Sequence, residues 1–133
     1  MQVSGIDHVN ILTDDLEGTA TFYERVLGLI RSENPSIRAG TAGYWMRDAG
    51  GLPIIHLVDR TTAPGRYDDY LPGESTNGFH HVALRCSGFE ATRAKLDELG
   101  LDYRFNDLTH IGLRQLFLAD PNAVNLELNF NGD

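Results

Sequence analysis

The chain has 133 residues and a formal net charge of −8, from 19 acidic and 11 basic side chains. That charge disfavours nonspecific binding to nucleic acid or to an anionic membrane surface, and no apolar stretch approaches the roughly 20 residues that a membrane span needs. The single cysteine, Cys86, excludes an intrachain disulfide. Since the first residues also lack a basic region and an apolar run, we expect a cytoplasmic protein without a signal peptide.

The first part of the chain, about residues 4–60, predicts one strand, one helix and three more strands. Alternation in the first strand places Val9 and Ile11 on one face, with Ile6, His8 and Asn10 on the other. The helix is expected to begin after a capping Asp14 or Asp15 and to end at Gly28, which suits a left-handed cap. The predicted strands cover residues 4–12, 29–33, 43–47 and 52–59, and Gly50-Gly51 makes the turn between the last two.

A segment of about residues 60–77 follows, rich in proline and glycine, and then the same order of elements returns over residues 78–131. The segment either spans the distance between the two halves or drapes over a cleft or a partner. The second half predicts a helix over 88–99 and a turn at Asp120-Pro121-Asn122. Its predicted strands cover residues 78–86, 102–106, 115–119 and 124–130.

The two halves are copies of one module, because matching phrases recur at offsets that shorten from 73 to 71 residues. Gly5-Ile6-Asp7-His8-Val9 matches Gly78-Phe79-His80-His81-Val82, and Ile55-His56-Leu57 matches Leu126-Glu127-Leu128. In the repeat, His8 therefore occupies the position equivalent to His81, and His56 the position equivalent to Glu127. Four side chains of metal-binding type stand at two equivalent positions of two modules.

These four side chains share the polar faces of their predicted strands. A polar face turned inward would enclose a cavity, and its unpaired groups would cost several kcal/mol unless partners satisfied them. A divalent Fe, Zn, Ni, Co or Mn ion would do so, since imidazole and carboxylate are suitable donors. The polar-face residues are His8, Asn10, His56, His81, Arg85, Asn125, Glu127 and Asn129.

We therefore predict metal ligands at His8, His56, His81 and Glu127, with catalytic roles for Glu127, His56 and, as a general acid or base, His110. Each residue also has a simpler interpretation: a structural histidine, a salt bridge from Glu127 to Arg85 or Arg114, or an exposed loop position for His110. His80 faces away from His81 and is interpreted as structural, and Cys86 as buried and inert. Residues predicted to contact substrate are Asn10, Trp45, Arg85, Tyr103 and Arg114, with Tyr44 and Arg104 as further candidates.

These motifs resemble the vicinal oxygen chelate superfamily, which includes glyoxalase I, bleomycin-binding and fosfomycin-resistance proteins, methylmalonyl-CoA epimerase and extradiol dioxygenases. The phrases that carry the resemblance begin at Asp7-His8-Val9 and Gly78-Phe79-His80-His81. The others are Asp15-Leu16, Phe22-Tyr23, Leu27-Gly28-Leu29, Phe117-Leu118-Ala119-Asp120-Pro121-Asn122 and Leu126-Glu127-Leu128.

The resemblance implies an α+β fold of two tandem βαβββ modules in one domain, with mixed sheets curled into a cup around a metal and helices outside. It matches His8, His81 and Glu127 to the family's ligands. His56 stands where glyoxalase I has a glutamate, which argues against lactoylglutathione lyase activity, and Ala123 stands where the family's turn usually has glycine.

The resemblance implies a metal-dependent lyase, isomerase or ring-cleaving dioxygenase for a small oxygenated molecule. The alternatives are a fosfomycin- or bleomycin-type resistance protein and a non-catalytic small-molecule binder. A homodimer is expected, with a cup built from modules of one chain or of two.

Overall fold

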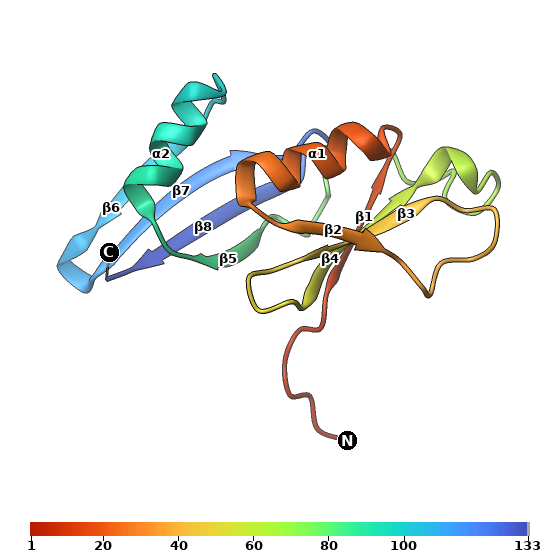
Figure 1. Ribbon diagram of the computed structural model, residues 1–133, viewed down its shortest axis with the longest axis horizontal. Helices are drawn as coiled ribbons and strands as arrows, with labels where there is room; N and C mark the ends of the chain where they lie inside the picture. Colours follow the sequence, from red (N-terminus) through yellow and green to blue (C-terminus); the bar gives the residue numbers. More distant parts are fainter. Residues whose placement is uncertain (133) are drawn as a thin grey trace. The chain divides into compact units, whose positions relative to one another are not determined.

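The computed structural model describes residues 1–132, and its contacts divide the chain into two compact units, Met1–Pro72 and a second unit that begins at Gly73. Each unit is one βαβββ module with a four-stranded mixed sheet and one helix (Figure 1). This confirms the predicted α+β fold of two tandem modules. The boundary between the units lies inside the predicted connecting segment.

In the first unit, β1 (Val9–Thr13) pairs in parallel with β4 (Pro53–Asp59), and β3 (Gly43–Arg47) and β2 (Ile30–Glu33) continue the sheet in antiparallel fashion. The helix α1 (Leu16–Leu27) follows β1. A short 3-10 helix, η1 (Arg60–Thr62), begins the connecting segment.

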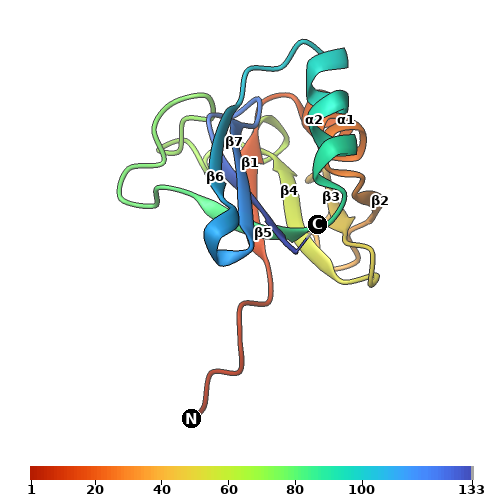
Figure 2. The same ribbon diagram turned by 90° about the vertical axis from the view of Figure 1, so that its left-hand side faces the viewer.

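The second unit repeats this order. Strand β5 (Val82–Cys86) pairs in parallel with β8 (Asn125–Asn131), and β7 (Leu113–Ala119) and β6 (Arg104–Leu108) complete the sheet. The helix α2 (Phe89–Glu98) lies on one face of this sheet (Figure 2), where Phe89 meets Phe130 edge to face at 5.4 Å between ring centroids. A 3-10 helix, η2 (Thr109–Ile111), links β6 to β7.

The ends of α1 form as its sequence predicts. The side chain of Asp15 accepts a hydrogen bond from the amide of Gly18, and Gly28 closes the helix in the left-handed region at φ 67°. Tyr23 and Ala20 are fully buried on the face toward the sheet. The helix thereby covers the apolar face of the first sheet.

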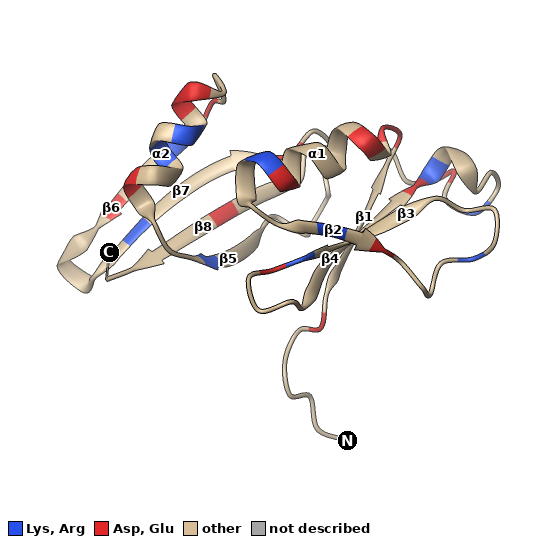
Figure 3. Cartoon of the chain, in the orientation of Figure 1, with Lys and Arg blue, Asp and Glu red and all other residues tan. Residues whose placement is uncertain are grey.

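The strands alternate as predicted, and this alternation positions the polar residues. In β4, Ile55 and Leu57 are fully buried while His56 lies on the opposite face; in β8, Leu126 and Leu128 are buried while Glu127 lies opposite. The red segment of β8 in Figure 3 is Glu127. One face of each sheet is therefore core and the other is polar.

The first strand of each module is shorter than predicted. The ladder of β1 with β4 starts at Val9 opposite Ile55, and that of β5 with β8 starts at Val82 opposite Leu126. His8 and His81 thus immediately precede their strands. Alternation of residue types continues past the end of a ladder, so it does not reveal where the partner strand stops.

None of the helices within residues 1–132 is long and apolar enough to cross a membrane.

Candidate functional site

In the first unit, the rings of His8 and Trp45 stack on the ring of His56. The rings of His8 and His56 lie 3.6 Å apart between centroids with planes 12° apart, and Trp45 stacks on His56 at 5.1 Å. Trp45 is opposite His56 in the register of β3 and β4, so the sheet itself sets this contact. The two predicted ligands of the first module therefore lie together on its polar face.

The imidazole of His8 has one nitrogen engaged and the other available. Nδ1 of His8 lies 2.6 Å from a carboxylate oxygen of Asp7, which orients the ring and leaves Nε2 with its lone pair.

Nε2 of His56 is buried and has no hydrogen-bond partner within the described chain. Burial, and then the nearby His8, lower the pKa of His56 and favour the neutral imidazole that metal binding requires. A buried polar nitrogen without a partner costs about 1–3 kcal/mol, and a bound ligand would recover that cost.

In the second unit, His81 and Glu127 form a direct pair. Nε2 of His81 lies 3.0 Å from Oε2 of Glu127, and the carboxylate side chain is 14% exposed. The other carboxylate oxygen, Oε1, accepts a hydrogen bond from Nε2 of Gln115 at 2.7 Å. Gln115 also donates to Asn129 and accepts from Asn106, so three amide side chains fix the orientation of the carboxylate.

The interpretation of His80 as a residue facing away from His81 is wrong. Nδ1 of His80 lies 2.9 Å from Nδ1 of His81, with the rings edge to face at 5.2 Å between centroids. The error arises because both residues precede β5, where strand alternation does not apply. His80 is therefore the orienting neighbour of His81.

The structure places the predicted ligands as two pairs, His8 with His56 and His81 with Glu127, each within one unit. Within residues 1–132 no group of three or more histidine, cysteine, aspartate or glutamate side chains stands close enough to hold a metal ion. The alternative salt bridges of Glu127 are wrong, because Arg114 instead pairs with Glu90 and the carboxylate of Glu127 meets His81 and Gln115.

Several predicted contact residues of the second unit have structural partners. The hydroxyl of Tyr103 donates to Asp97, and the guanidinium of Arg114 lies 4.0 Å from the centroid of the Phe89 ring. Arg104 similarly lies over Phe117.

Arg85 on β5 and His110 in η2 are exposed, and Cys86 is half-buried rather than buried.

In the first unit, Tyr44 is part of a charged network and not of the site. Its hydroxyl donates to Glu17, which also pairs with Arg31, and this bond raises the pKa of Tyr44. Asn10, by contrast, lies beside His56 in the register of β1 and β4 and lines a cavity with it.

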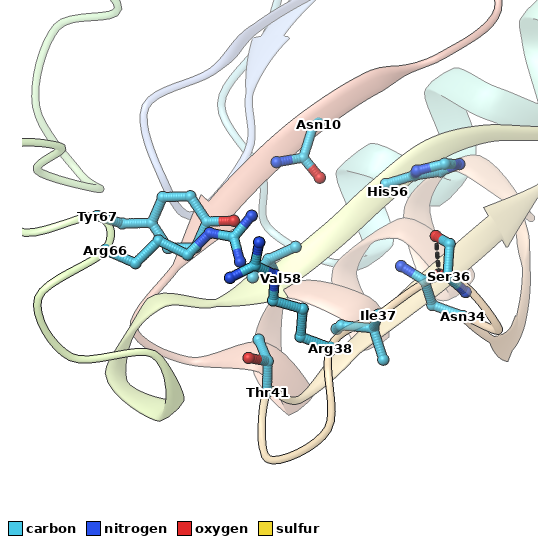
Figure 4. A pocket seen from close by; sticks show the side chains of 10 residues that line it. All are labelled: Asn10, Asn34, Ser36, Ile37, Arg38, Thr41, His56, Val58, Arg66 and Tyr67. Carbon is cyan, nitrogen blue, oxygen red and sulfur yellow. Dashed lines mark hydrogen bonds between the residues drawn. The ribbon is translucent and has the colours of Figure 1, made fainter.

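That cavity, of about 300 Å³, is formed wholly by residues of the first unit (Figure 4). Its floor is the polar face of β1 and β4, and its walls come from the β2–β3 loop and the connecting segment. Sequence reasoning missed Arg38, Arg66 and Tyr67, which lie in irregular segments without a periodic signal. The lining is Asn10, Asn34, Ser36, Ile37, Arg38, Thr41, His56, Val58, Arg66 and Tyr67.

A family model described as the glyoxalase/bleomycin resistance protein/dioxygenase superfamily matches residues 5–128. The chain belongs to this superfamily. The protein "Glyoxylase I 4" of Arabidopsis thaliana is 27% identical over 131 residues, covering 96% of this chain and 71% of the relative.

Solved structures of this superfamily share the fold. The glyoxylase/bleomycin resistance protein/dioxygenase domain from Frankia sp. EAN1pec has a TM-score of 0.74 and 19% identity, over 98% of this chain and 93% of that one. A mutant of the fosfomycin resistance protein FosX from Listeria monocytogenes, complexed with Mn(II) and 1S,2S-dihydroxypropylphosphonic acid, has a TM-score of 0.70 and 15% identity, over 98% and 94%.

Proposed function

We propose that this superfamily member is a metal-dependent enzyme that binds two adjacent oxygens of a small substrate. Its ion would be held by His8, His81 and Glu127, with His56 as the fourth donor. Two units would contribute two donors each, from one chain or from two chains of a cytoplasmic homodimer.

The observation that carries this proposal is the state of the donor atoms. Nε2 of His56 is buried without a partner, and Asp7 holds the other nitrogen of His8. In the second unit, Gln115 orients Glu127 through a hydrogen bond to Oε1, and His80 orients His81 through a contact with Nδ1. Imidazole ligands supported in this way are characteristic of metal sites, and this set of nitrogen and carboxylate donors suits Mn, Fe, Co, Ni or Zn.

When bound, such an ion supplies Lewis acidity that stabilises an enolate or alkoxide, or, as Fe(II), supports ring cleavage by dioxygen. The residues of the chain orient the substrate and move its proton. Glu127 or His56 would accept the proton when displaced from the ion, because both side chains lie on the polar faces of their sheets. Asn10, beside His56, offers an amide to a substrate oxygen.

Elemental analysis of protein purified without added metal tests the proposal. We expect one divalent ion per set of donors, lost in Glu127→Ala and in His8→Ala. His110→Ala is the control, since His110 is exposed in η2 and should keep the metal. Equal metal content in all three variants, or none in the wild type, would contradict the proposal.

The reaction class follows from a second measurement on the same preparation. Dioxygen uptake with catechols would identify the ring-cleaving activity, whereas turnover of 2-oxoaldehyde–thiol adducts or acyl-CoA esters without dioxygen would identify lyase or isomerase activity.

A further inference from the structure

The cavity of the first unit is lined by two arginines that have no acidic partner within residues 1–132. Arg38 comes from the β2–β3 loop and Arg66 from the connecting segment, and both line the same cavity (Figure 4). Among residues 1–132 neither guanidinium forms an ion pair, although Arg31, Arg60 and Arg114 each pair with a carboxylate.

The lack of a carboxylate partner for Arg38 and Arg66 among the described residues is unexpected in a chain with a net charge of −8. With 19 acidic against 11 basic side chains, carboxylates are abundant, yet within residues 1–132 no carboxylate pairs with Arg38 or Arg66. An anion in the cavity would supply both guanidinium groups with a partner of opposite charge. Guanidinium groups bind carboxylate and phosphonate oxygens through two parallel hydrogen bonds, which neutral oxygens do not match.

Other groups of the lining add donors to this site. Asn34 accepts from the amide and the hydroxyl of Ser36 through Oδ1, and its side chain lines the cavity with an NH2 group that no other described residue engages. The guanidinium of Arg66 lies 5.2 Å from the centroid of the Tyr67 ring, a contact that limits its freedom before any ligand arrives. Thr41 and Asn10 complete a lining rich in hydrogen-bond donors.

We propose that this arginine cavity, defined by Arg38 and Arg66, binds the oxyanion of a small oxygenated acid. His56 lines the same cavity, so the anionic group of the substrate would bind beside the proposed metal ligand. This inference adds a substrate class to the proposed function. It rests on that function for the assumption that the cavity beside His56 is part of an active site. The substrate class is then a small acid that carries a carboxylate or a phosphonate.

Titration of the full-length protein with methylphosphonate and with acetate, followed by 15N NMR, tests the proposal. We expect saturable shifts at Arg38, Arg66 and Asn10 with at least one probe, and none with neutral N-methylacetamide. The double variant Arg38→Gln/Arg66→Gln should weaken binding at least about tenfold, because two charge-assisted contacts are lost. Whichever probe binds more tightly identifies the anion.

Arg25→Gln is the matched control: Arg25 is an exposed arginine in the last turn of α1, outside the cavity, and should leave binding unchanged. Running each titration with and without EDTA separates this proposal from the metal proposal. Binding that survives EDTA and is lost in the double variant supports the arginine cavity even if elemental analysis finds no metal.

The proposal is overturned if neither probe binds, if N-methylacetamide binds equally well, or if the double variant binds like the wild type. Both substituted arginines are exposed, and an unchanged thermal midpoint confirms that the variants are folded.

Discussion

His81 and Glu127 meet through the register of two parallel strands. Ala83 of β5 is opposite Glu127 of β8, and His81 stands two residues before Ala83. The first module has the same arrangement, with Asn10 of β1 opposite His56 of β4 and His8 two residues before Asn10. One local geometry therefore produces both pairs, as an imidazole stack in one module and as an imidazole–carboxylate contact in the other.

The first prediction concerns Gln115, which donates a hydrogen bond to the carboxylate of Glu127. Gln115→Leu keeps the size of the side chain but removes the bond to Oε1 of Glu127. We expect metal affinity to fall about 10- to 100-fold, the usual effect of losing such a supporting bond. Competition with a chromophoric chelator measures it.

The control for this experiment is Arg114→Gln on the same strand. Arg114 pairs with Glu90 and does not contact the carboxylate of Glu127, so its loss should leave metal affinity unchanged. Equal affinities for the wild type and Gln115→Leu would show that the orientation of Glu127 does not depend on Gln115.

His80 gives the second prediction. His80→Ala removes the ring that contacts Nδ1 of His81 but keeps the backbone carbonyl that accepts from Asn125. We expect about tenfold weaker metal binding with unchanged thermal stability. The same chelator competition measures it, with His110→Ala as the matched histidine control. A His80→Ala protein that binds metal like the control would mean that His80 does not position His81.

The sequence predicts the fold well because the module is repeated and its strands alternate. Spacing alone assigns the strand residues to the correct faces. In β4 it separates Ile55 and Leu57 from His56, and in β8 it separates Leu126 and Leu128 from Glu127. The caps of α1 follow from the chemistry of single residues, Asp15 and Gly28.

The surroundings of the candidate site are harder to predict, since they depend on contacts between distant segments. Nothing near Arg38 or Arg66 in the sequence indicates that a loop and the connecting segment line one cavity. Conversely, Tyr103 and Arg114 have residue types suited to anion binding, but neighbours in their own unit engage them. Residue type alone does not reveal which polar groups have structural partners.

The third prediction is a pH-dependent contribution from Asp14. Arg60 donates two hydrogen bonds of 2.9 Å to this carboxylate, and they hold the pKa of Asp14 below its ordinary value of 3.8. A carboxyl group whose pKa is lower in the folded state stabilises the fold above the unfolded value, and that contribution is lost as pH falls through the folded value. Asp14→Asn should therefore lower the free energy of unfolding near neutral pH, and the difference should narrow in acid.

Urea unfolding of the wild type and Asp14→Asn at several pH values between neutral and strongly acidic measures this difference. The control uses Arg60→Gln as the background. Without the guanidinium, substitution of Asp14 should produce little pH-dependent difference. A difference that persists unchanged in that background would assign the effect to another partner of Asp14.

The fourth prediction concerns Ala123 in the turn before β8, where the backbone has a φ of 62°. An L-residue in this left-handed region costs about 1–2 kcal/mol, whereas glycine adopts it freely. Glycine also gains freedom in the unfolded chain, which opposes the benefit by about 0.4–1 kcal/mol. Ala123→Gly should therefore raise the free energy of unfolding by about 0.5–1 kcal/mol, measured by urea denaturation.

Asn77 provides the matched comparison, because it has a similar φ of 57° but belongs to a residue type that tolerates the left-handed region. Asn77→Gly should consequently stabilise the protein less than Ala123→Gly, or destabilise it. The backbone amide of Asn77 keeps its bond to Ser75 in that variant, so the comparison isolates the side chain. If the two glycine variants were equally stable, strain at Ala123 would not be the cause of any gain.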